Sequence, residues 1–281
     1  MNTTYSLHHI SSATAFGFDA DDYSRFKFGD DAVAQDFGTA LADGFIGQHI
    51  AGIPAGTQLV VISSPYSFIP TATFAMKNWF VYRLNRWLAA NNYPVVQETK
   101  VHRTITYKED YGELDAQARI NLIGNDSFHI DKQFLEGKTL IFLDDIKITG
   151  SHERMIMKMV GEYGLKNDIY MLYFAELVNK DIHPSIENFL NYHLVKTIFD
   201  LEAVIKSGSF AINTRIVKYI LNYNFDCFRL FIGNQTDQFI NLLYNMALGN
   251  GYHTIDAYAK NLNFIAENLF TKHKNLLKYG N

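Results

Sequence analysis

The chain has 281 residues, with 25 Lys and Arg against 29 Asp and Glu, 48% hydrophobic residues and a single cysteine. A chain of this length and apolar content builds one large or two modest domains with a packed core, so extensive disorder is excluded. The net charge of -4 provides no broad basic field for duplex nucleic acid, and the one thiol, Cys227, cannot form an internal disulfide.

The N-terminal residues show no basic start followed by an apolar run, which an export signal requires. The apolar runs are also far shorter than the roughly 20 residues that cross a bilayer. We therefore expect a cytoplasmic protein with no membrane partner.

The first 54 residues are rich in Asp, Gly and Phe and show no long clean period. We expect them to form a small irregular or β cap. Within this segment, DDYSRFKFGD interleaves cations with aromatic residues, which predicts a short strand with the aromatic rings on one side and Arg25 and Lys27 mostly on the other.

Four apolar runs have strand character, at residues 59–62, 95–101, 139–143 and 169–175. Three of them are nearly continuous in apolar residues, which is typical of strands covered on both faces and indicates a parallel sheet. Helical patterns separate the first run from the second and the third from the fourth. The sequence therefore predicts an α/β fold with a doubly wound, mainly parallel sheet.

From about residue 180 the chain reads as successive helices, because Leu, Ile, Phe and Tyr recur every three or four residues. The expected helical segments are residues 185–194, 200–208, 214–223, 236–251 and 255–270. The predicted organisation is an N-terminal cap or hood (1–54), a core (55–178) and a helical C-terminal subdomain (179–281).

The segment KTLIFLDDIKITGSHERM, residues 138–155, combines acids with a helix start. An apolar strand delivers Asp144 and Asp145 to its carboxyl end, where ligands of open parallel sheets bind. Thr149 and Gly150 then open a helix, whose N-terminal N–H groups suit a phosphate. Two carboxylates beside a phosphate site suit the hydroxyls of a sugar phosphate with Mg²⁺ nearby. A helix cap without a ligand is the alternative.

Residues 140–152 resemble the phosphoribosyl pyrophosphate (PRPP) loop of type I phosphoribosyltransferases, with an apolar strand, two acids, three intervening residues, Thr-Gly and then small or polar residues. The resemblance implies that Asp144 and Asp145 bind the ribose 2- and 3-hydroxyls together with Mg²⁺, and that residues 149–152 bind the 5-phosphate. The PRPP-binding stretch is then Asp144, Asp145, Ile146, Lys147, Ile148, Thr149, Gly150, Ser151 and His152.

Two positions depart from the pattern of this family. Ile148 stands where many purine-type members carry an acid, which argues against hypoxanthine or guanine as the acceptor. His152 replaces the usual closing Thr or Ser, so its backbone N–H can serve but a hydroxyl contact is missing.

Two further segments are similar to the family at lower specificity. ISSPYSFIPTA follows the first core strand at the position of the pyrophosphate loop, and an ordinary connection is equally compatible with its sequence. The resemblance assigns pyrophosphate binding to Ser63, Ser64, Pro65 and Tyr66. The long polar connection after the second strand is similar to competence-type relatives, and a solvated charged loop is the alternative. The resemblance assigns catalytic roles to Asp144, Asp145, Arg103, Lys108 and Arg119, the three cations neutralising departing pyrophosphate.

The Tyr-Ser-Arg-Phe-Lys pattern in the N-terminal part is similar to phosphoribosyltransferases of bacterial tellurite-resistance gene clusters. This likeness makes Arg25 and Lys27 candidates for binding the acceptor, although a structural role is favoured for them.

These observations predict a Mg²⁺-dependent phosphoribosyltransferase that moves the ribose 5-phosphate of PRPP to a small-molecule nitrogen acceptor and releases pyrophosphate. A PRPP- or nucleotide-binding sensor or assembly protein on the same fold is the alternative. A purely structural role for the two acids requires that both be buried and paired with Lys or Arg. The acceptor stays open, and so does the oligomeric state, for which the family suggests a homodimer.

Overall fold

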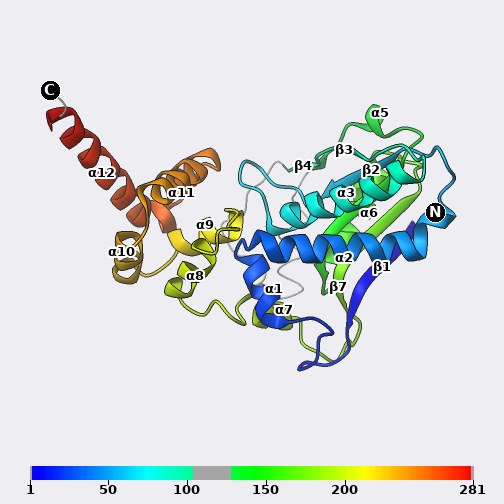
Figure 1. Ribbon diagram of the computed structural model, residues 1–281, viewed down its shortest axis with the longest axis horizontal. Coiled ribbons are helices and arrows are strands. Elements are labelled where there is room, and N and C mark those ends of the chain that lie inside the picture. The colour runs from blue at the N-terminus through cyan, green and yellow to red at the C-terminus, as the bar shows by residue number, and fades with distance from the viewer. Residues whose placement is uncertain (1, 104–127, 280–281) are drawn as a thin grey trace.

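The computed structural model describes residues 2–103 and 128–279. A five-stranded sheet lies in one part of the molecule, and the C-terminal helices α8 to α12 (residues 201–279) lie in the other (Figure 1). All pairings in this sheet are parallel, and the strand order is β1-β7-β6-β2-β3. Its strands are β1 (Asn2–Ile10), β2 (Leu59–Ser63), β3 (Gln97–Glu98), β6 (Thr139–Lys147) and β7 (Ile169–Leu177). The α/β fold class with a mainly parallel sheet is confirmed.

Alternating side chains of the central strands divide the apolar core into two layers. Val61 and Ile141 face one layer, which α2 (Asp31–His49) and α3 (Ala72–Ala90) cover. Val60 and Phe142 face the other, which α6 (Ser151–Glu162) and the short α5 (Lys132–Leu135) cover. Helices on both faces explain why the strands are almost continuously apolar.

The predicted strand at residues 95–101 is largely absent. Of that run, only Gln97 and Glu98 pair with β2, and both are exposed. A separate two-stranded antiparallel sheet follows, made of β4 (His102–Arg103) and β5 (Phe128–His129). The predicted strand is too long because β3 lies at the edge of the sheet, where it pairs only with β2, and apolar residues alone do not create a second pairing.

The expectation of an irregular or β cap from residues 1–54 is wrong in its secondary structure. β1 pairs with β7 at the edge of the main sheet, and α2 packs along α3 in the same layer. α1 (Ala20–Lys27) replaces the predicted short strand, and η1 (Ile50–Gly52) follows α2. Asp19 caps α1 by accepting from two backbone N–H groups, and Tyr23, Phe26 and Lys27 bury one helical face. The buried side chains are spaced three and four residues apart, as in a helix, and this spacing decides the structure in place of the alternation of aromatic and basic residues.

The C-terminal half is helical, as predicted. From Val195 onward it has an apolar core of its own, whereas the buried Ile186 and Leu190 pack in the core layer of α2 and α3. Its helices are α7 (Ile186–Asn191), η3 (Ile198–Asp200), α8 (Leu201–Ile205), α9 (Thr214–Leu221), α10 (Phe225–Gly233), α11 (Asp237–Gly249), η4 (Tyr252–Thr254) and α12 (Asp256–Tyr279). The aromatic stretch around Cys227 forms α10, which was not predicted, and Cys227 is half-buried against this core. The domain boundaries at residues 54 and 178 stay a prediction.

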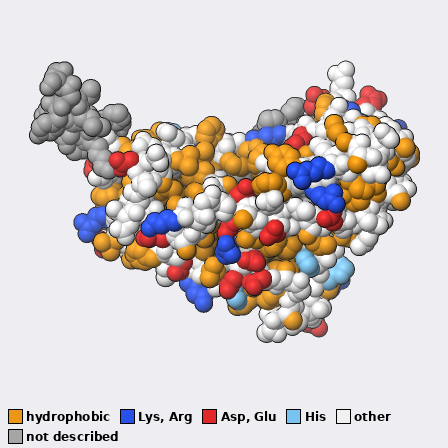
Figure 2. Space-filling model, viewed as in Figure 1, with side chains coloured by type: hydrophobic (Ala, Val, Ile, Leu, Met, Phe, Trp, Pro, Cys, Tyr) orange, Lys and Arg blue, Asp and Glu red, His pale blue; other side chains and the backbone are white. Residues whose placement is uncertain are grey.

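Phe28 and Ile69 join the two halves, because both side chains are fully buried in the helical core although they come from the sheet half. Acidic and basic side chains are interspersed over the visible face, without a large field of one sign (Figure 2). Among the described residues, no helix has the length and apolarity that a membrane crossing requires.

Candidate functional site

The crevice between β2 and β6 is a topological switch point. From β2 the chain crosses over α3 to β3 on one side, whereas from β6 it crosses over α6 to β7 on the other. In open α/β sheets, ligands bind outside the carboxyl ends of the strands at such a point. The strand order therefore predicts a ligand site at the carboxyl ends of β2 and β6.

Strand β6 is longer than predicted and carries both acids within it. It pairs with β7 as far as Lys147, whereas its pairing with β2 ends where Leu143 meets Ser63. Successive side chains of a strand point to opposite faces. Asp144 therefore lies on the α6 side, and Asp145 lies on the side of α1 and α3.

Asp144 is partly buried and accepts several hydrogen bonds. His152 Nδ1 donates to its Oδ2 at 2.5 Å, and Ser64 Oγ donates to its Oδ1 at 2.7 Å. Burial alone would raise the pKa of Asp144, but the His152 ring, the Ser64 hydroxyl and the charge of Lys27 outweigh burial and hold this pKa well below its usual value. With 17% of its side chain exposed, Asp144 is an ionised acceptor within reach of a ligand.

Asp145 is buried among protein partners. Lys27 forms an ion pair with its Oδ2, Tyr23 donates its hydroxyl to the same oxygen at 2.6 Å, and Thr73 Oγ1 donates to Oδ1 at 3.0 Å. Burial, followed by the Asp145 charge, raises the pKa of Tyr23 well above its usual value, so its hydroxyl stays a donor. The Asp145 side chain is only 7% exposed.

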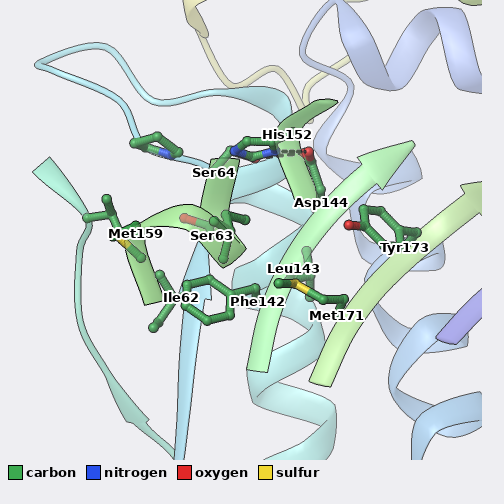
Figure 3. A pocket seen from close by; sticks show the side chains of 13 residues that line it. Ile62, Ser63, Ser64, Phe142, Leu143, Asp144, His152, Met159, Met171 and Tyr173 are labelled. Carbon is green, nitrogen blue, oxygen red and sulfur yellow. Dashed lines mark hydrogen bonds and ion pairs between the residues drawn. The ribbon is translucent and has the colours of Figure 1, made fainter. Parts of the chain in front are cut away.

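A pocket of about 380 Å³, including its open mouth, lies on the Asp144 side (Figure 3). Ser63, Ser64 and Pro65 from the end of β2 line it together with Asp144 and His152. Its remaining wall is mainly apolar, with Ile62, Phe142, Met159, Met171 and Tyr173 among the lining residues. The structure therefore brings the predicted pyrophosphate segment and the predicted ribose acid to one pocket.

The loop between β6 and α6 is closely bonded within itself. Gly150, the N-cap of α6, has φ 67°, a left-handed conformation that favours glycine. The hydroxyls of Thr149 and Ser151 lie 2.9 Å apart, and Arg154 Nη1 donates to the Thr149 carbonyl at 2.9 Å. Lys147 forms ion pairs with Glu153, in the first turn of α6, at 2.9 Å and with Glu176 of β7 at 3.0 Å, so both carboxylates pair with its charge beside the helix N-terminus.

Other predicted site residues lie apart from the pocket. The Tyr66 ring stacks edge-on against Phe74, with ring centroids 5.1 Å apart. Arg25 forms an ion pair with Asp30 at 2.6 Å, whereas Lys27 is the partner of Asp145. The remaining positions are divided between the core, a strand and the undescribed segment. Ile146 and Ile148 pack on the core layer of α2 and α3, Arg103 belongs to β4, and Lys108 and Arg119 lie outside the described residues.

Sequence reasoning missed several residues around this site. Thr73, near the start of α3, donates to both acids, weakly to Asp144 at 3.4 Å. Lys100 Nζ donates to the Ser67 carbonyl at 2.9 Å and lies 3.7 Å from the centre of the Tyr66 ring. Burial lowers the pKa of Lys100. No local motif marks these two residues, since their roles come from neighbours distant in sequence.

The helical half holds the segment that follows β2. Asn250 Oδ1 accepts from the backbone N–H groups of Phe68 and Ile69 at 2.9 and 3.1 Å. Thr214 donates its hydroxyl to the Ile69 carbonyl at 2.8 Å. This half also reaches α1, because Asn213 Nδ2 donates to the Lys27 carbonyl at 3.1 Å. The helical half therefore holds both the segment after β2 and the end of α1, which lie on two sides of the site.

The described residues contain no group of three or more His, Cys, Asp and Glu that could hold a metal ion. Mg²⁺ is commonly bound by one or two carboxylates together with water and substrate phosphates. Of the side chains lining the pocket, Asp144 supplies the carboxylate. The donor set fits a Mg²⁺ ion whose remaining ligands come from a phosphorylated substrate and water.

Comparison with known proteins identifies a family. The sequence model of the PRTase ComF-like family matches residues 1–265. No curated protein matches. Among solved structures, a hypoxanthine phosphoribosyltransferase from Staphylococcus aureus is 11% identical over 56% of this chain and 74% of that chain, with a TM-score of 0.30. The Trypanosoma cruzi hypoxanthine phosphoribosyltransferase in complex with its product IMP is 13% identical over 57% and 68%, with a TM-score of 0.29.

Proposed function

Because the chain belongs to the PRTase ComF-like family, we propose that it is a phosphoribosyltransferase that uses PRPP and a nitrogen acceptor. The observation that carries this proposal is a pocket at the switch point between β2 and β6, where residues 63–65 meet Asp144 and His152. In the reaction, the acceptor nitrogen forms a bond to C1 of the ribose while the bond from C1 to the pyrophosphate oxygen breaks. Pyrophosphate leaves with the bonding electrons.

We assign ribose binding to Asp144 and a positioning role to Asp145. Ligand hydroxyls would replace the Ser64 and His152 donors on the Asp144 carboxylate, which stays ionised because of its lowered pKa. Asp145 has no comparable access, since Lys27 and Tyr23 surround it. The resemblance implies that both acids bind the ribose, whereas this assignment gives ribose binding to Asp144 alone.

We assign the 5-phosphate to the start of α6. The helix has 12 residues, and its N-terminal N–H groups and partial positive charge favour an anion. The left-handed Gly150 turns the chain so that the Thr149 and Ser151 hydroxyls lie together at this N-terminus. Hydrogen bonds to a charged group contribute about 1.5 to 3 kcal/mol each.

We assign pyrophosphate to residues 63–65, with Lys100 as an additional cation beside the same segment. Tyr66 would support the segment through its contact with Phe74 rather than bind the ligand. Arg103, Lys108 and Arg119 stay predicted to neutralise the leaving group. Mg²⁺, which offsets phosphate charge when bound, would be held by Asp144 together with substrate oxygens and water.

The test is calorimetric titration of the full chain with PRPP and Mg²⁺, followed by a pyrophosphate-release assay with a panel of bases and amines. We expect saturable PRPP binding in the wild type and binding at least tenfold weaker in Asp144→Asn, which loses the charged acceptor. Asp36→Asn, an exposed acid of α2 outside the pocket, serves as the control. Unchanged PRPP affinity in Asp144→Asn contradicts the proposal.

A non-catalytic PRPP sensor is the second candidate. Asn250 and Thr214 form hydrogen bonds to the segment after β2. A ligand that moves this segment would therefore also move residues of the helical half. PRPP binding without pyrophosphate release for any acceptor of the panel favours the sensor, whereas release with one acceptor favours the enzyme.

A further inference from the structure

A second and larger pocket lies at the junction of the two halves of the molecule. We call it the junction pocket. Its volume is about 580 Å³, including its open mouth. It is formed by the turn between α1 and α2, the start of α3 and residues 211–213 just before α9. Figure 1 shows the first turn of α2 beside α9, where this junction lies.

Two aromatic side chains give the junction pocket apolar walls. Phe26 comes from α1 and is almost fully buried, and Phe74 comes from the first turn of α3 and is half-buried. Pro70 and Ile212 extend the apolar surface. Flat rings gain most from burial between such walls.

Two polar side chains face the same space with hydrogen-bonding capacity left over. Asn78 has no hydrogen-bond partner among the described residues, and it lies one helical turn beyond Phe74 on the same face of α3. Asp31 accepts only from Trp79 Nε1, at 3.2 Å, and no cation of the described part of the chain pairs with it. The neighbouring Asp30 differs, because Arg25 neutralises it.

We propose that the junction pocket binds a flat heteroaromatic ring carrying an amino group beside a ring nitrogen, as in aminopurines and aminopyrimidines. An Asn side-chain amide can donate to the ring nitrogen and accept from the amino group at once, which is how Asn reads adenine. The Asp31 carboxylate accepts the remaining amino N–H. Phe26 and Phe74 cover the ring.

The junction pocket is separate from the Asp144 pocket. Lys27, Thr73 and Asp145 form a bonded cluster between the two, since their chain neighbours Phe26 and Phe74 line one pocket and Asp144 lines the other. The two ligands therefore occupy different sites, and binding at the junction pocket does not depend on the proposed phosphoribosyl transfer.

The experiment is calorimetric titration of the full chain with adenine and, in parallel, with hypoxanthine, in which a carbonyl replaces the amino group. We expect saturable binding of adenine at one site per chain and at least about tenfold weaker binding of hypoxanthine, because its carbonyl faces Asp31 without a proton to donate. Saturating PRPP with Mg²⁺ leaves the adenine affinity unchanged.

Variants locate the ligand. Asp31→Asn is expected to weaken adenine binding about tenfold. Asn78→Ala, which removes a side chain that has no hydrogen-bond partner among the described residues, is expected to leave the fold intact and to weaken adenine binding about fivefold. Asp36→Asn, on an exposed face of the same helix, leaves it unchanged. The proposal is overturned by absence of saturable adenine binding, by equal affinity for the two bases, by displacement with PRPP, or by wild-type affinity in Asn78→Ala.

Discussion

The two neighbouring acids of β6 lie in opposite surroundings. On the pocket side, Asp144 is partly exposed and accepts from His152 and Ser64, groups that a ligand can replace. On the α1 side, Asp145 is buried against Lys27 and Tyr23. The difference follows from the pleat of a strand, which turns adjacent side chains to opposite faces. Adjacency in a motif therefore does not give two residues the same role.

The largest expected effect is on the α1 side. Lys27→Met leaves the Asp145 charge buried without its cation, and removing one partner of such a pair costs about 3 to 5 kcal/mol of folding free energy. Urea unfolding measures this loss. Adding Asp145→Asn removes the unpaired charge and restores most of the stability. A Lys27→Met protein within about 1 kcal/mol of wild type contradicts the buried-pair account.

On the pocket side, the expected effect is smaller and depends on pH. The pKa of Asp144 is depressed in the folded state, so the stability it contributes is present above its unfolded pKa of about 3.9 and is lost as pH falls toward the lower folded value. Without Mg²⁺ or PRPP, Asp144→Asn is expected to be about 1.5 to 3 kcal/mol less stable than wild type at neutral pH. The gap should narrow below about pH 4.

The measurement is urea unfolding of wild type and Asp144→Asn at several pH values between 3 and 7, which gives the difference in their unfolding free energies at each pH. Asp36→Asn, at an exposed acid, is the control and should show no such trend. A difference between wild type and Asp144→Asn that is constant over the whole range would contradict the lowered pKa.

The smallest expected effect comes from the anchor in the helical half. Asn250→Ala removes the acceptor for Phe68 and Ile69, at a cost of about 1 kcal/mol, and loosens the segment that carries residues 63–65. We expect a PRPP affinity lowered about fivefold. Asn250→Asp keeps the acceptor oxygen and should retain most of the affinity. If both variants match the wild type, the helical half does not position the pocket.

Local patterns predicted the parallel sheet and most helices, because apolar runs and helical spacing are set by nearby residues. Local patterns gave wrong predictions where contacts with residues distant in sequence determine the secondary structure. β6 was expected to end at Leu143, before the acids, but β7 continues to pair with it through Lys147. The short strand expected around Arg25 and Lys27 became α1, because packing against the rest of the core favours the helical face.

The candidate site was predictable only in part for the same reason. The spacing from Asp144 to His152 is a local signal, and it led to the pocket. The burial of Asp145 depends on Lys27, 118 positions earlier, and the anchor of the segment after β2 depends on Asn250, 182 positions after Phe68. Nothing in the flanking sequence marks either contact.

The most direct test of the division between the two acids is the PRPP affinity of two folded variants, measured by calorimetry with Mg²⁺ present. One variant is Asp144→Asn, and the other is the double variant Lys27→Met with Asp145→Asn, which replaces the buried pair by neutral groups. We predict that Asp144→Asn binds at least tenfold more weakly than wild type, whereas the double variant stays within about threefold. Equal losses in the two variants, or the larger loss in the double variant, would contradict the account.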